Sequence, residues 1–100
     1  MDIEVKWSPE AIEDIDSIAG YIARDSEFYA RSVVNEILSL GTKIAEEPLI
    51  GRIVPELDDE NIRERFVYSY RVVYTIEDTV ITVVAVIHGK RLLENVPDRF

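Results

Sequence analysis

Polar and apolar residues alternate over residues 2–7, and this period of two predicts a half-buried strand at the start of the chain. Ser8 and Pro9 then provide a helix start, because a serine hydroxyl caps free backbone N–H groups and proline lacks the N–H that the first turn would leave unpaired. Apolar residues next recur every three or four positions. This spacing predicts an amphipathic helix that ends near Arg24.

A second helix is predicted after the break at Asp25 and Ser26. Its apolar stripe runs from Ala30 to Ala45, and Pro48 stops it. Because so few residues join the two helices, they are expected to pack as an antiparallel hairpin. A loop rich in proline, glycine and acidic residues is predicted from Pro48 onward.

From residue 62 the period returns to two and predicts three strands, at 62–67, 70–76 and 80–87, with a tight turn at Glu77-Asp78. The last strand is almost entirely apolar, so it should be central and covered. The predicted fold is therefore a single α+β domain over residues 1–100, in the order β-α-α-β-β-β. Its helical hairpin packs on one face of a small, mostly antiparallel sheet.

The faces of these strands decide where the cations lie. In the strand 70–76, alternation places Arg71 on the face away from the helices. A two-residue loop before this strand would put Arg63 and Arg65 under the helices, whereas a three-residue loop would put them beside Arg71. Burying two unpaired arginines is costly, which favours the three-residue loop and one open face that carries all three arginines.

The last strand extends this predicted open face. With a turn at Glu77-Asp78, the face holds Val80, Thr82, Val84, Val86 and His88, and Lys90 and Arg91 follow at the rim. An apolar floor with a cationic fringe suits an amphipathic peptide with acidic edges, or a ribose-phosphate chain. Structural roles are an alternative to this binding face. Arg63 is also explained as a charge that keeps an edge strand from aggregating, and a lone histidine is more often structural than catalytic.

The composition of the chain excludes some classes of protein. The net charge of −9 disfavours non-specific nucleic-acid binding. The charge is uneven, with a net −10 over residues 1–61 and +1 over residues 62–100. The chain has no cysteine, and its longest apolar run, 83–87, is far too short for a membrane span. A cytoplasmic protein with no metal or cofactor is expected, and its acidic start is unlike a signal peptide.

Several stretches together resemble the RelE/ParE superfamily, the toxins of type II toxin–antitoxin pairs. They are WSPEAIEDIDSIAGYIARDS, EEPLIGRIVPEL, NIRERF, YRVVY and VIHGKRLL, and they cover nearly the whole chain in family order. The resemblance implies the same β-α-α-β-β-β fold. The ending VIHGKR resembles ParE-like and plasmid-stabilisation members, whose characterised representatives poison DNA gyrase.

The resemblance also implies an alternative activity, because RelE-like members cleave messenger RNA in the ribosome without a metal. Candidate catalytic residues for that chemistry are Arg63, Arg65, Arg71, His88 and Arg91. RelE-like toxins often use a tyrosine or histidine after the last arginine, and here the stretch LENVPD contains neither. This departure and the negative charge favour the ParE branch and a non-enzymatic toxin. A third hypothesis is a member that binds an antitoxin but has lost toxicity.

The implied partner is a ParD-like or RelB-like antitoxin whose C-terminal segment folds on binding. Such a segment is expected to lie along the helical hairpin and cross the open sheet face, and the acidic helices favour a basic segment. The residues predicted to contact it are Ile12, Ile15, Ile22, Val34, Ile37, Val73, Val84 and Val86.

Overall fold

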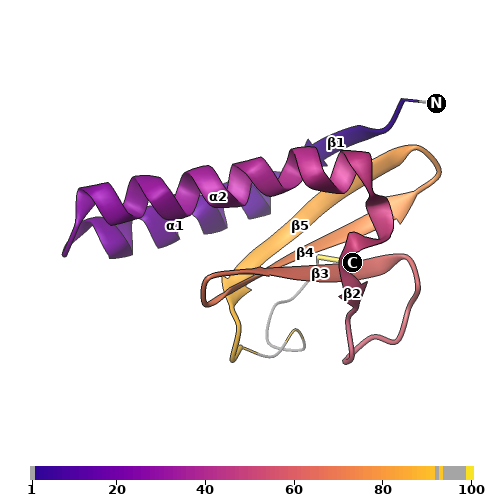
Figure 1. Ribbon diagram of the computed structural model, residues 1–100. Helices are drawn as coiled ribbons and strands as arrows, with labels where there is room; N and C mark the ends of the chain where they lie inside the picture. Colours follow the sequence, from indigo (N-terminus) through magenta and orange to yellow (C-terminus); the bar gives the residue numbers. More distant parts are fainter. Residues whose placement is uncertain (1, 92, 94–98) are drawn as a thin grey trace.

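In the computed structural model, two helices lie along one face of a five-stranded sheet (Figure 1). The structure describes residues 2–91, 93 and 99–100. The helices are α1 (Pro9–Ala23) and α2 (Glu27–Glu46). A short 3-10 turn, η1 (Pro48–Ile50), follows α2. The strands are β1 (Glu4–Trp7), β2 (Arg52–Ile53), β3 (Ile62–Val67), β4 (Tyr70–Glu77) and β5 (Val80–His88).

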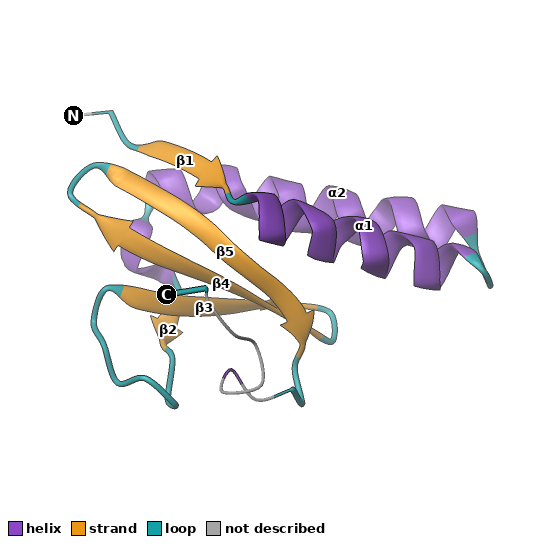
Figure 2. Cartoon of the chain, turned by 180° about the vertical axis from the view of Figure 1, so that it is seen from behind, coloured by secondary structure: helices purple, strands orange, loops and turns teal. Residues whose placement is uncertain are grey.

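Both helices begin where the sequence predicts. The Ser8 hydroxyl accepts a hydrogen bond from Ala11 N at 3.1 Å, and the Ser26 hydroxyl accepts one from Tyr29 N at 3.0 Å. These bonds satisfy N–H groups that lack a partner within the helix. The helices form the predicted antiparallel hairpin, whose tip projects well beyond the turn between β3 and β4 (Figures 1 and 2). Neither of these two described helices has the length and apolar content that crossing a bilayer requires.

The sheet has the order β1-β5-β4-β3-β2. β1 pairs in parallel with β5, and the other neighbouring strands are antiparallel. β5 is therefore central over its first half, as its apolar sequence predicts. The short β2 was not expected, because two residues with no alternation give no strand signal.

Two apolar clusters cover the two faces of the sheet. The larger lies between the sheet and the helices and includes Ile37, Ile44, Val72, Tyr74 and Val83. The smaller lies on the other face, where Val54 and Leu93 cover residues of β4 and β5. The face predicted to be open is therefore partly closed by the chain itself.

Tyr74 ties the loop after α2 to the sheet. Its buried hydroxyl donates to Pro48 O at 2.7 Å and accepts from Gly51 N at 2.9 Å. A Cβ at Gly51 would lie 2.7 Å from both Glu64 O and the Tyr74 hydroxyl. Only glycine lets the chain approach this closely, so the position fixes where β2 begins.

Candidate functional site

The register between β3 and β4 determines which arginines lie together. Val67 pairs with Tyr70 across a two-residue turn, Tyr68-Ser69, and Phe66 pairs with Arg71. Paired residues point to the same face, so Arg63 and Arg65 point to the helix side and Arg71 to the other. The prediction that the three arginines share one open face is wrong.

The two-residue turn, which the sequence analysis disfavoured, is tolerated because Arg63 and Arg65 are neither deeply buried nor unpaired. The Arg63 guanidinium donates to Gly51 O and to Glu60 O, both at 3.0 Å. The Arg65 guanidinium donates to Ile50 O at 3.1 Å. Both side chains therefore donate to backbone carbonyls of the segments before and after β2. The sequence pattern does not predict that these segments lie beside β3.

Arg71 is buried rather than presented to a ligand, with 4% of its surface exposed. Its Nε lies 2.8 Å from Glu64 Oε1, and its two terminal nitrogens lie 2.8 and 2.9 Å from the oxygens of Glu56. Glu64 is also buried and accepts from Arg52 Nε at 2.6 Å. We call these four residues the Arg71 ion cluster. Neither Glu56 nor Glu64 is among the candidate residues that the sequence analysis names.

The charges in this cluster stabilise one another. Hydrogen bonds from Arg71 lower the pKa of Glu56 from 4.5 to about 2, against the opposing effect of desolvation. The Glu56 carboxylate in turn raises the pKa of Arg71. Arg71 therefore remains a cation whose charge is already balanced by two carboxylates, and it is poorly suited to bind a phosphate.

The Arg71 ion cluster also holds the chain after β5. A terminal nitrogen of Arg71 donates to Arg91 O at 3.1 Å, and Leu93 N donates to Glu56 Oε2 at 3.3 Å. Leu93 then packs against the sheet, where it is 3% exposed. Arg71 thus acts on the C-terminal segment through a backbone contact.

His88 also lies on a different face from the one predicted. A bulge between β4 and β5 places Val84 out of register, so that Val73 pairs with Ala85 and Tyr70 with His88. Beyond this bulge Val86 and His88 point to the helix side, whereas Val84 stays on the other face. The prediction that Val80, Thr82, Val84, Val86 and His88 share one face is therefore wrong for the last part of the strand. The predicted turn is also displaced by one residue, to Asp78-Thr79, because Glu77 pairs with Val80.

A cavity of about 440 Å³ lies beside His88, between α1 and the ends of β4 and β5. The rings of His88 and Tyr70 meet edge to face with their centres 6.0 Å apart. Arg91 also lines the cavity and is exposed. His88 and Arg91 are thus brought together, while Arg71 lies on the other face of the sheet and Arg63 and Arg65 do not line this cavity.

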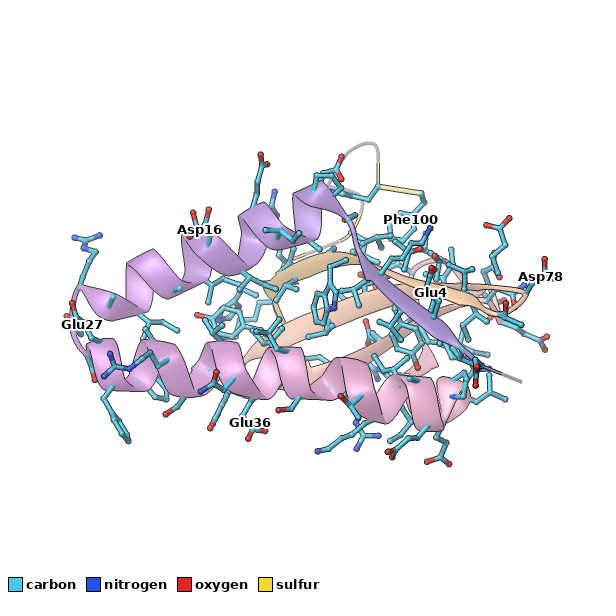
Figure 3. All side chains as sticks on the ribbon, turned by 90° about the horizontal axis from the view of Figure 1, so that it is seen from above. Glu4, Asp16, Glu27, Glu36, Asp78 and Phe100 are labelled. Atoms are coloured by element: carbon cyan, nitrogen blue, oxygen red, sulfur yellow. The ribbon has the colours of Figure 1, made fainter. Side chains whose placement is uncertain are left out.

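A groove runs along the outer surface of the helical hairpin. Two adjoining cavities of about 500 and 480 Å³ share Asp16, Ala19 and Val34 as lining residues. We call them the hairpin groove. Figure 3 shows α1 and α2 side by side from above, with Asp16, Glu27 and Glu36 marking their acidic surface.

The residues predicted to contact an antitoxin differ in accessibility. Ile12 is 55% exposed and lines the hairpin groove together with Ile15 and Val34. Ile22 lies at the edge of the core, 9% exposed. The remaining four residues of that prediction are buried at 0–7% exposure and serve the protein core: Ile37, Val73, Val84 and Val86. Among the described residues, no group of three or more histidine, cysteine or acidic side chains is arranged to hold a metal ion.

Comparison with solved structures finds the same fold in known toxins. The chain resembles the chromosomal ParDE system of P. aeruginosa with a TM-score of 0.72 at 15% identity, over 88% of this chain and 97% of the other. It resembles the RelBE2 toxin–antitoxin complex of Mycobacterium tuberculosis with a TM-score of 0.63 at 17% identity, over 88% and 99% of the two chains. It resembles a mutant of E. coli toxin RelE in the free state with a TM-score of 0.64 at 18% identity, over 90% of this chain and 86% of the other.

A search of curated proteins found no match. The family described as the ParE toxin of the type II toxin–antitoxin system parDE, however, matches residues 5–93, which is most of the chain. The structural likenesses agree in fold, with two helices on a mixed five-stranded sheet. The chain therefore belongs to the ParE toxin family, the toxin components of type II toxin–antitoxin systems.

Proposed function

We propose that this toxin acts in the cytoplasm by binding a protein target, with DNA gyrase as the target implied by the ParE branch, and that a cognate antitoxin neutralises it. One observation carries the choice of a protein target. Arg71, one of the candidates for holding RNA phosphate, is buried and ion-paired to Glu56 and Glu64. Cleavage of RNA without a metal needs cations available to the phosphate as charge develops, and this cation is already neutralised.

The hairpin groove supports binding of an antitoxin segment. Its floor consists of small and apolar side chains, and its charged lining is acidic on balance: Glu13, Asp16 and Glu27 with one base, Arg31. An amphipathic helix with an apolar stripe and basic flanks fits this composition. The solved relatives include toxin–antitoxin complexes, which supports a ParD-like or RelB-like partner here. Exposed Ile12 and partly exposed Val34 are the contact residues that we retain from the sequence prediction.

The test uses purified toxin and purified gyrase. Inhibition of gyrase supercoiling, relieved by adding the cognate antitoxin, is the expected result. Normal supercoiling at saturating toxin, in a preparation that still arrests growth when expressed alone, would reject gyrase as the target. Growth unaffected by expression without antitoxin would reject the toxin function itself.

One observation favours the alternative, a RelE-like ribosome-dependent mRNA endonuclease. An imidazole, a phenol and a guanidinium, from His88, Tyr70 and Arg91, line one cavity. General acid–base cleavage uses groups of these kinds. Toeprinting on translating ribosomes separates the two functions, because only the endonuclease produces new message ends at the A site. Arg71→Ala is a poor variant for either test, since it breaks a buried ion cluster and would remove activity through the fold.

A further inference from the structure

Tyrosine rings gather where the helical hairpin overhangs the turn between β3 and β4. The rings of Tyr29 and Tyr68 meet edge to face with centres 5.9 Å apart. Tyr70 lies beside His88 and shares a cavity with Tyr21. Tyr21 and Tyr29 are close enough to Tyr70 to contribute to the upward shift of its pKa, whose main cause is burial. We call Tyr21, Tyr29, Tyr68 and Tyr70, which come from four different elements, the tyrosine face.

Most of this aromatic surface is open to solvent. Tyr21 is 68% exposed, Tyr68 55% and Tyr29 46%. A fold that needed these rings for its core would bury them. Exposed tyrosines gathered on one surface are instead typical of protein interfaces, where tyrosine supplies contact area with little loss of side-chain entropy.

Tyr68 is held in a backbone conformation that tyrosine rarely adopts. Its φ is +53°, and the other described non-glycine residues with positive φ are both aspartates, Asp58 and Asp78. Asparagine, aspartate and glycine occupy such positions at lower cost than an aromatic residue. Nothing in the turn itself requires a ring, so the strain points to a use for the exposed side chain.

The charges around the tyrosine face favour an acidic partner, although the protein as a whole is acidic. The Arg24 guanidinium lies 6.0 Å from the centre of the Tyr21 ring, and Arg91 lines the cavity. Asp14 also lines it, but this carboxylate is ion-paired with Arg99 at 2.8 Å. The backbone brings these groups together, since Gly89 N donates to Ser69 O at 2.8 Å.

We infer that the tyrosine face is the surface with which this toxin grips its target, and that the target presents an apolar side chain flanked by carboxylates. The inference rests on the proposed function and adds the location and chemistry of the contact. Stacking on bases is the rival use of exposed tyrosines. Protein is favoured over RNA because a net charge of −9 repels a phosphate chain, whereas a short acidic segment needs only the local cations.

The tyrosine face and the hairpin groove lie on different sides of α1. Ser17, Ile18 and Tyr21 line the cavity of the tyrosine face, whereas Asp16, Ala19 and Ala23 line the groove. Variants of the tyrosine face should therefore lose target binding and keep antitoxin binding. This separation distinguishes the inference from a general loss of function.

The first test is Tyr68→Asn, with Asp78→Asn as the matched control at the other hairpin turn. Both substitutions place asparagine at a positive φ, of 53° or 54°, on the first residue of a two-residue turn. We expect Tyr68→Asn to reduce growth inhibition at least tenfold, while its thermal midpoint stays unchanged or rises and its antitoxin affinity is kept. Asp78→Asn should remain as toxic as wild type. Tyr21→Gln, on exposed helix surface, repeats the test without touching a turn.

A second pair tests the predicted charge of the partner. Arg91→Glu should weaken target binding more than tenfold and Lys6→Glu, on exposed β1 surface, should change it less than twofold. With gyrase as the probe, both are measured by supercoiling inhibition.

The outcomes separate the two proposals. Wild-type toxicity in both Tyr68→Asn and Tyr21→Gln would overturn the inference and leave the proposed function standing. New A-site message ends made by wild type and lost in Tyr68→Asn would also overturn it, in favour of RNA stacking. A wild-type protein that leaves growth unaffected would overturn the proposed function and the inference together.

Discussion

The two faces of the sheet are covered by different kinds of interaction. On the helix side, buried aliphatic residues of α1 and α2 pack against β4 and β5. On the other side, a small apolar cluster is closed by the Arg71 ion cluster, which joins β3, β4, the loop after β2 and the C-terminal segment. The helix side is covered by many apolar contacts, which have no preferred direction. The other side depends on a few hydrogen bonds and ion pairs, which do. Single substitutions should therefore act locally on the helix side and more widely on the other.

The largest expected effect comes from Glu64→Ala. Removing this carboxylate leaves Arg71 buried with only part of its charge balanced, and such a change typically costs about 3–5 kcal/mol. The free energy of unfolding from urea titration measures it. The paired replacement Glu64→Leu with Arg71→Met should recover more than half of the loss, because it removes the two buried charges together, and the cluster residues that stay charged, Glu56 and Arg52, are partly exposed to water. Equal losses in the single and paired variants would show that packing, not charge, closes this face.

The corresponding change on the helix side is Ile37→Ala. Ile37 is fully buried, so its truncation leaves a cavity and should cost about 2–5 kcal/mol. Ile12→Ala is the matched control on exposed helix surface and should change unfolding by less than about 0.5 kcal/mol. Ile12→Ala should still weaken antitoxin binding, which calorimetric titration with the purified antitoxin measures.

Acid should weaken the face that the Arg71 ion cluster closes. The folded-state pKa of Glu56 is about 2, below the ordinary 4.5, so its stabilisation is complete above pH 4.5 and is lost as pH falls toward 2. Because Glu56 is partly exposed to solvent, we expect a loss of about 1 kcal/mol rather than the full value of the shift. The gap in unfolding free energy between wild type and Glu56→Gln should therefore shrink from pH 6 to pH 3. Glu60→Gln, an exposed carboxyl in the same loop, should follow wild type throughout.

Local patterns along the chain predict the helices and the three long strands well. Ser8, Ser26 and Pro48 mark helix ends through short-range bonds and sterics, and the boundaries agree within a residue or two. Residues 62–67 form β3 with the predicted bounds. These helix ends and strand bounds depend on residues only a few positions apart, so a single sequence is enough to predict them.

The candidate site could not be predicted in the same way, because it depends on register. A one-residue difference in the turn at Tyr68-Ser69 exchanged the faces of Arg63 and Arg65, and a bulge at Val84 moved His88 to the helix side. The cost of burying arginines pointed to the wrong turn, since the carbonyls that satisfy them lie in a loop remote in sequence. The positive φ of Tyr68 could not be predicted either, because Tyr68-Ser69 contains none of the glycine, asparagine or aspartate residues that are typical of a two-residue turn.

The smallest expected effect sharpens the comparison at the tip of the hairpin, where the helix-side cover ends. Ser26→Ala removes the hydroxyl that accepts from Tyr29 N and should cost about 1 kcal/mol in urea unfolding, whereas Ser26→Gly should cost only a few tenths. Because Tyr29 belongs to the tyrosine face, loosening this first turn of α2 should also lower toxicity slightly in the alanine variant. A stability loss with no change in toxicity would mean that Tyr29 is positioned by its contact with Tyr68, rather than by the helix cap.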